Sequence, residues 1–244
     1  MEIDKDVVEL ARDYFYFDPG TEDSIVGKTF VEDGYQFLTR ECDLRQNQVA
    51  GRRSYNFVIH DVWNGDFVVD QTLGESSSLA LYMLEAFKKI SCLLSNNDSV
   101  FVMNYYGLYD SMDFRAVIKT LKMVFPTMRI FHDGNYKKSS SSAPYNLVVF
   151  AKRSGSLRFR GLQEADLLES STIRYDALTE MQRREIDLDM LQNLDNIPYI
   201  LENANNGTKL LWEFQQNVRK HHNEALEDIR SDIISEDSDV DVEL

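Results

Sequence analysis

The feature that most constrains the fold is a regular alternation of apolar runs and amphipathic segments over residues 1–152. Runs rich in β-branched and aromatic residues predict strands at 24–30, 55–63, 99–107, 128–133 and 145–152. Apolar residues at helical spacing predict helices at 4–14, from 33, at 77–94 and at 112–125. Alternating strands and helices that end in two successive strands predict an α/β doubly wound sheet with an antiparallel last strand.

The run "YNFVIHDVW" at 55–63 is the strongest strand candidate. Its apolar stretch is continuous rather than alternating, which is typical of a strand buried on both faces. We therefore expect it to lie at the centre of the sheet.

Length and charge limit the classes of function. The chain has 244 residues, of which 43% are hydrophobic, enough for one ordinary domain with appendages. Its formal net charge is −15. A protein that binds nucleic-acid phosphates needs a surplus of Lys and Arg, so nucleic acid is not an expected partner. Anionic membrane surfaces are disfavoured for the same reason.

The two cysteines and the absence of long apolar runs bear on the compartment. Cys42 and Cys92 are too few for a disulfide framework and lack the spacing of a zinc site. We expect a reducing compartment, the cytoplasm or alternatively the nucleus. No run reaches the length of a membrane span and no signal peptide opens the chain, which predicts a soluble product without a membrane contact.

The composition changes after residue 152, where short amphipathic segments replace the strands. We interpret 153–206 as a helical cap packed on the sheet. Apolar residues spaced by threes and fours predict one long helix at 207–233, whose stripe needs a partner surface. That partner is the sheet domain of the same chain or, alternatively, a second protomer or another protein. The acidic segment 234–244 is expected to be a solvated tail.

Four segments together carry a family resemblance. The stretches "MEIDKDVVELARDYF", "VEDGYQFL", "YNFVIHDVWNGD" and "VFVMNYYG" resemble, in order and spacing, the spermidine synthase-like branch of the Rossmann-type S-adenosylmethionine-dependent methyltransferases. The details are similar to the fungal spermine/spermidine synthase family members. The resemblance covers residues 1–152 and implies S-adenosylmethionine as cofactor, with a small-molecule or protein methyl acceptor whose identity stays open.

The resemblance also implies roles for particular residues. Glu2, with Asp4 in the same turn, would receive the ribose hydroxyls of the cofactor, a task that suits a carboxylate because it accepts two hydrogen bonds. Asp33 would face the adenine amino group, and Gly34 would allow close approach of the backbone. Asp61 would lie beside the reactive centre at the carboxyl edge of the sheet.

The remaining candidates border the acceptor. Asp66 is a second catalytic candidate, because a carboxylate near an amine can hold the ammonium ion or take its proton. The candidates for acceptor contacts are Trp63, Asn64, Asn104 and Tyr105. No metal site is predicted.

Structural roles compete with several of these assignments. Glu2 and Asp4 suit the N-terminus of a helix through its dipole, and Asp33 suits an N-cap. Trp63 suits loop packing equally well. His60 precedes Asp61 on a strand, so its side chain is expected on the opposite face, as a core or packing residue.

The chain departs from the family at two places. In the family, aminopropyl transfer to polyamines uses paired acidic groups and a Gly-Pro or similar turn after the strand; this chain has Asp61, Asp66 and Asp70 there but lacks that turn. The first strand of the family and its glycine-rich turn, which wraps the methionine part of the cofactor, should precede "EID" and are absent. We therefore expect a shortened product of a larger enzyme, weak or inactive as it stands, whose longer parent could carry a membrane anchor.

Three functions follow in order of preference. The first is an S-adenosylmethionine-dependent methyltransferase. The second is a non-catalytic binding or regulatory protein built on that fold, and the third is an aminopropyltransferase of polyamine synthesis.

Overall fold

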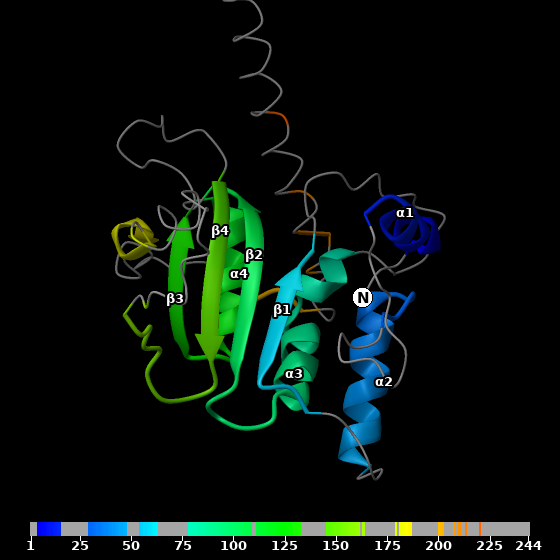
Figure 1. Cartoon of the computed structure of the whole chain (residues 1–244). Coiled ribbons are helices and arrows are strands. Elements are labelled where there is room, and N and C mark those ends of the chain that lie inside the picture. The colour runs from blue at the N-terminus through cyan, green and yellow to red at the C-terminus, as the bar shows by residue number, and fades with distance from the viewer. Residues whose placement is uncertain are drawn as a thin grey trace, which may run out of the picture.

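A five-stranded sheet forms the centre of the described part of the chain, and helices α3 and α4 cover one of its faces (Figure 1). The strands are β1 Phe57–Asp61, β2 Val100–Gly107, β3 Thr127–His132, β4 Tyr145–Lys152 and β5 Glu185–Ile186. The helices are α1 Lys5–Phe15, α2 Gly34–Gln46, α3 Leu84–Leu93 and α4 Met112–Lys122, with 3-10 turns η1 Ser78–Tyr82 and η3 Met181–Arg184. This computed structural model describes residues 4–15, 29–47, 54–62, 78–108, 111–132, 145–161, 163, 179, 181–186, 200–202, 207, 209, 210, 213 and 220.

The strand order confirms the α/β fold with an antiparallel last strand. The order is β1-β2-β4-β3-β5, so β4 lies between β2 and β3. β1 pairs with β2 in parallel, and the other pairs are antiparallel. The parallel pair is joined through α3, as a parallel crossover requires.

The helix predicted at 77–94 is two elements. Met83 has an extended backbone, with φ −83° and ψ 158°, and separates η1 from α3. Its apolar side chain still lies in the core with no exposed surface. The apolar stripe is therefore continuous across a break in the backbone, which periodicity alone does not reveal.

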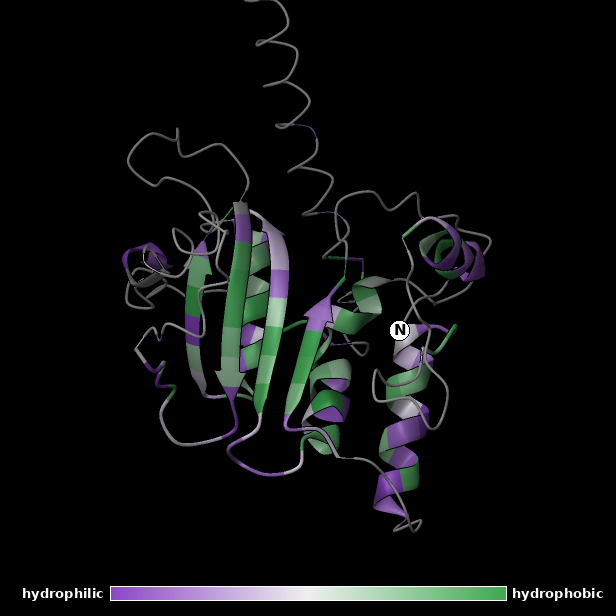
Figure 2. Cartoon of the chain, in the orientation of Figure 1, coloured by the Kyte–Doolittle hydropathy of each residue, from purple (hydrophilic) through white to green (hydrophobic). Residues whose placement is uncertain are grey.

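The core lies between the sheet and the helices α3 and α4. Along β2, Phe101, Met103 and Tyr105 point to this helix-covered face and have no exposed surface. Figure 2 shows β1 changing from apolar to polar toward its carboxyl end. β1 therefore supplies apolar packing along most of its length and polar groups at its carboxyl end.

The position of β1 corrects the prediction that it is a central strand buried on both faces. It is the outer strand of the described sheet, and Phe57 and Ile59 are 50% and 65% exposed. Among the described residues, no strand pairs with the outer edge of β1 and no helix covers the face that carries these two side chains. We call this side of the sheet the open face.

The two cysteines form a disulfide, although their small number predicted no disulfide framework. α2 packs beside α3, and Cys42 forms a disulfide with Cys92, with Cα atoms 5.8 Å apart. The pairing depends on the packing of two helices, and it joins cysteines separated by 50 residues in sequence. Cysteine count and spacing do not carry that information.

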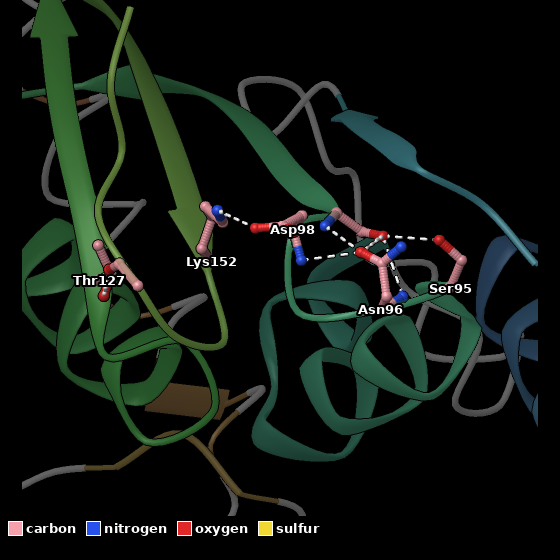
Figure 3. A network of polar contacts seen from close by, with 7 residues as sticks. Ser95, Asn96, Asp98, Thr127 and Lys152 are labelled. Carbon is pink, nitrogen blue, oxygen red and sulfur yellow. Dashed lines mark hydrogen bonds and ion pairs between the residues drawn. The ribbon is translucent and has the colours of Figure 1, made fainter.

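Polar contacts connect the start of β2 to the end of β4 (Figure 3). Oδ1 of Asn96 accepts hydrogen bonds from the backbone N–H groups of Asp98 and Ser99, which closes a tight turn before β2. Lys152, the last residue of β4, pairs with Asp98 at 3.2 Å. This network lies at the amino end of β2, away from the strand ends that carry the candidate site.

Parts of the C-terminal third contact the sheet domain. Arg129 of β3 forms two hydrogen bonds of 2.6 Å with the carboxylate of Glu185, which attaches β5 to the sheet edge. The backbone N–H of Leu201 donates to Oγ1 of Thr120 on α4 at 2.9 Å. Most of the predicted cap at 153–206, the long helix at 207–233 and the tail at 234–244 lie outside the described residues.

Candidate active site

The parallel pairing of β1 with β2 brings two predicted site residues together. Asp61 ends β1, and Asn104 of β2 lies opposite it in the strand register. The Nδ2 group of Asn104 donates a hydrogen bond of 3.0 Å to Oδ1 of Asp61. A side-chain amide that donates to a carboxylate restricts its orientation and leaves further lone pairs for other donors. The structure thus joins the predicted reactive-centre carboxylate to a predicted acceptor-side residue.

The pair carries two kinds of oxygen acceptor, an exposed carboxylate and a shielded amide oxygen. Asp61 is exposed to solvent. Oδ1 of Asn104 is shielded from solvent and has no hydrogen-bond partner within the described residues. A shielded amide oxygen costs free energy unless a donor reaches it. Asp61 and Asn104 therefore suit a ligand that brings N–H or O–H groups.

His60 lies behind Asp61 on the helix-covered face, as predicted. It is 6% exposed and packs edge-to-face against Tyr82 and Phe101, with ring centroids 4.8 Å and 6.0 Å away. Burial lowers the pKa of His60 to about 4, and nearby backbone carbonyls and the Asp61 carboxylate only partly oppose this shift. The ring is therefore neutral at pH 7 and serves packing.

Tyr82 is a residue of this region that the sequence interpretation missed. Its hydroxyl donates a hydrogen bond of 2.8 Å to the carbonyl of Val62, the residue after Asp61. Burial raises the pKa of Tyr82 and the Asp61 carboxylate adds to this effect, so the hydroxyl keeps its proton. The bond holds the backbone where the chain leaves β1. In the sequence Tyr82 lies within an apolar segment, and no motif or spacing pairs it with Val62.

Asp33 and Gly34 begin α2. Oδ1 of Asp33 accepts a hydrogen bond of 2.9 Å from the backbone N–H of Gln36, which confirms the N-cap alternative. Gly34 is the first helical residue. Figure 1 shows that α2 begins at the end of the molecule toward which the β1 arrow points. The adenine role of Asp33 and Gly34 stays a prediction.

Asp4 has a local role at the start of α1. Its Oδ1 accepts a hydrogen bond of 2.9 Å from the backbone N–H of Asp6. This contact agrees with the alternative of a carboxylate that favours a helix N-terminus. The ribose role of Asp4 stays a prediction. The predicted site residues Glu2, Trp63, Asn64 and Asp66 lie outside the described residues.

The position of Tyr105 corrects its assignment to the acceptor side. Tyr105 follows Asn104, so its side chain points to the opposite face of β2, where it has no exposed surface. Its hydroxyl donates to Oδ2 of Asp113, a carboxylate that is 2% exposed near the start of α4. The alternation of side chains along a strand explains why one of these neighbours meets Asp61 and the other lies in the core.

Neither a metal cluster nor a membrane-spanning helix occurs among the described residues. No group of three or more His, Cys, Asp or Glu side chains in the described ranges could hold a metal ion. None of the helices that the structure describes is long and apolar enough to cross a membrane.

Comparisons with known proteins identify a sequence relative and solved structures of similar fold. The chain is 25% identical, over 196 residues, to an N-terminal histidine N-methyltransferase of Emericella nidulans. It is structurally similar to a probable spermidine synthase of Corynebacterium glutamicum, with a TM-score of 0.52, 12% identity and coverage of 83% of this chain. A spermidine synthase of Thermotoga maritima covers 63% of this chain and 44% of its own, at 18% identity and a TM-score of 0.42. No family model matches the chain.

These findings confirm the predicted resemblance to spermidine synthase-like methyltransferases, with a methyltransferase as curated relative and a spermidine synthase as neighbour in fold. The alignment covers 80% of this chain and 31% of the Emericella nidulans protein. The chain spans 62% of the Corynebacterium glutamicum protein. The chain therefore corresponds to about a third of the length of its curated relative.

Proposed function

We propose that this chain forms the acceptor side and part of the adenosine side of an S-adenosylmethionine-dependent methyltransferase that methylates nitrogen. The observation that carries the proposal is the hydrogen-bonded pair of Asp61 and Asn104 at adjacent parallel strands. Ligands of open α/β sheets bind at the carboxyl ends of such strands. The nitrogen acceptor is supported by the name of the Emericella nidulans relative, an N-methyltransferase.

The described residues fit the adenosine part of such a cofactor. Adenine and ribose carry N–H and O–H donors, and the side chains of Asp33 and Asp61 offer carboxylate oxygens. Asp33 uses Oδ1 as the cap of α2, and a carboxylate has lone pairs for more than one donor. Asp33 would hold the adenine amino group, and Asp61 would lie nearer the reacting atoms.

S-adenosylmethionine, when bound, supplies an electrophilic methyl group on a sulfonium. Asp61 would accept a hydrogen bond from the acceptor N–H and orient the nitrogen lone pair, and it would hold the proton that methylated nitrogen releases. Asn104 would keep the Asp61 carboxylate in position through its amide hydrogen bond. The bond from Tyr82 to the carbonyl of Val62 supports the backbone next to Asp61.

Aminopropyl transfer is the second candidate, because the Corynebacterium glutamicum neighbour in fold is a probable spermidine synthase. Both reactions need a carboxylate that holds an amine, which Asp61 would provide in either case. The sequence from Asp61 to Gln71, "DVWNGDFVVDQ", lacks the turn of the polyamine enzymes, which favours methyl transfer.

Calorimetric titration of the 244-residue chain with S-adenosylmethionine tests the cofactor, and an assay with methyl-labelled cofactor tests the transfer. The acceptors are a peptide with an N-terminal histidine and a polyamine. We expect weak cofactor binding and slow transfer of label to the histidine peptide, in keeping with the weak activity that the sequence predicts for this chain. Asp61→Asn should lower turnover by roughly 10- to 100-fold, the usual size of a lost charged hydrogen bond. The control is Asp98→Asn, because Asp98 is an exposed carboxylate at the other end of β2.

Each alternative has its own result. In a parallel assay with decarboxylated S-adenosylmethionine, which carries the aminopropyl group, formation of a longer polyamine would support aminopropyl transfer instead. Absence of cofactor binding by the folded wild-type chain would contradict the proposal and favour the non-catalytic alternative. Equal loss of turnover in Asp61→Asn and Asp98→Asn would remove Asp61 from the reaction.

A further inference from the structure

We propose that Cys42 and Cys92 form a reversible thiol–disulfide site, which a small thiol such as glutathione opens at Cys92 and which controls the attachment of α2 to α3. The two residues are the only cysteines of the chain, and they come from different helices. Their Cα atoms are 5.8 Å apart, within the range that a disulfide needs.

The two cysteine residues differ in exposure. Cys42 is 4% exposed and belongs to the buried side of α2. Cys92 is partly exposed on α3. Thiol–disulfide exchange requires an attacking thiolate to reach one sulfur in line with the other. Cys92 is therefore the sulfur that an external thiol meets first, and Cys42 is the leaving group.

Polar groups around the pair suit the reduced state as well as the disulfide. Nε2 of Gln46, one turn after Cys42 on α2, lies 3.5 Å from the Cys42 sulfur and donates to it. Such a donor favours negative charge on the sulfur and helps it leave as a thiolate. The Cys92 sulfur lies 3.7 Å from the carbonyl oxygen of Cys42, which can accept a bond from a Cys92 thiol. Both sulfurs thus have a partner after reduction.

The exchange proceeds in two balanced steps. A glutathione thiolate attacks the Cys92 sulfur, the Cys42–Cys92 bond breaks, and Cys42 leaves as a thiolate. A second glutathione thiolate attacks the glutathione sulfur of the mixed disulfide and releases the Cys92 thiolate. Two glutathione molecules are oxidised to their disulfide, and the protein gains two electrons and, on protonation, two thiol protons. Oxidised glutathione reverses both steps.

The helix that the disulfide holds buries few of its side chains. α2 buries Phe37, Leu38 and Cys42 out of 13 residues, and Lys89 of α3 lies over the ring of Tyr35 at 5.5 Å. A disulfide that closes a loop of this length typically contributes as much to the free energy of unfolding as the burial of several apolar side chains. Reduction should therefore let α2 open locally while the sheet keeps its structure.

Regulation of the candidate site follows only if the proposed function holds, since that proposal assigns Asp33, the N-cap of α2, to adenosine. The test does not depend on it. Hydrogen exchange of the oxidised chain is compared with that of the chain reduced by a phosphine, without cofactor. We expect exchange of α2 amides to rise about 100-fold on reduction, in line with typical disulfide effects. Amides of α4 should exchange at the same rate in both states.

Variants and mass measurement complete the test. Cys92→Ser should show fast α2 exchange under oxidising and reducing conditions alike. Limiting glutathione should give a mixed disulfide that peptide mass spectrometry places on Cys92, and Gln46→Ala should slow its formation. Unchanged α2 exchange on reduction of the wild type, loss of α4 protection together with α2, or a mixed disulfide on Cys42 would each overturn the proposal.

Discussion

The side-chain amide of Asn104 donates a hydrogen bond of 3.0 Å to the carboxylate of Asp61, across 43 residues of sequence. The two residues are register partners in β1 and β2, so the bond follows from the parallel pairing of these strands. Parallel strands place their carboxyl ends at one edge of the sheet. A site at this edge is therefore assembled by strand pairing.

Replacement of Asn104 by Leu should affect the site more than the fold. The change removes the amide bond to Asp61 and keeps a side chain of similar size, so we expect the free energy of unfolding to fall by about 1 kcal/mol or less. Turnover in the methyl-transfer assay should fall by about 10-fold through loss of Asp61 orientation. Urea unfolding and steady-state kinetics measure the two effects. Asn97→Leu, in the exposed turn before β2, is the control; an equal loss there would contradict the role of Asn104.

His60 should make stability depend on pH. Its pKa is about 4 in the folded chain against about 6.5 when unfolded, so the unfolded chain binds more protons between these values. His60 makes its full contribution to the free energy of unfolding above pH 6.5. As the pH falls toward 4, roughly 3 kcal/mol of that contribution is lost. Urea unfolding at pH 7, 5.5 and 4 should show a weaker dependence for His60→Phe. Identical dependence in both proteins would refute the assignment.

Two buried tyrosines should differ in the cost of losing their hydroxyl. Tyr82→Phe removes a bond to the neutral carbonyl of Val62, and we expect a loss of about 1 kcal/mol. Tyr105→Phe removes a bond to the buried carboxylate of Asp113, which should cost about 2 to 3 kcal/mol. Both changes keep the aromatic packing, so each is a control for the other. Urea unfolding gives the order, and a larger loss for Tyr82→Phe would contradict the prediction.

Gly207 should not tolerate a side chain. A Cβ atom there would come within 2.7 Å of the Glu202 backbone nitrogen and 2.8 Å of the Met83 sulfur. Part of this contact is backbone, which cannot move aside cheaply, so Gly207→Ala should lower the free energy of unfolding by about 1 to 3 kcal/mol. Gly161→Ala is the matched control, because its Cβ would have no atom within 4 Å. Equal stability of the two variants in thermal unfolding would show that the segment near Gly207 does not pack against Met83.

Local pattern predicted much of the secondary structure. The helical spacing before Tyr14, the Asp33 cap and the apolar runs of β2, β3 and β4 predicted elements that the structure contains. These signals are local, because a helix or strand is set by side-chain periodicity and by residues at its ends. The spacing of His60 and Asp61 likewise predicted that they lie on opposite faces of β1.

Relationships between distant segments were decided by tertiary structure. The continuous apolar run of β1 indicates that both faces tolerate apolar side chains, yet Phe57 and Ile59 are exposed, because exposure depends on which elements cover the strand. The Cys42–Cys92 bond and the bond from Tyr82 to Val62 depend on helix packing. Sequence alone determined the elements and the residues with suitable chemistry. Only the fold, through strand register and packing, decided that Asn104 meets Asp61 while Tyr105 lies in the core.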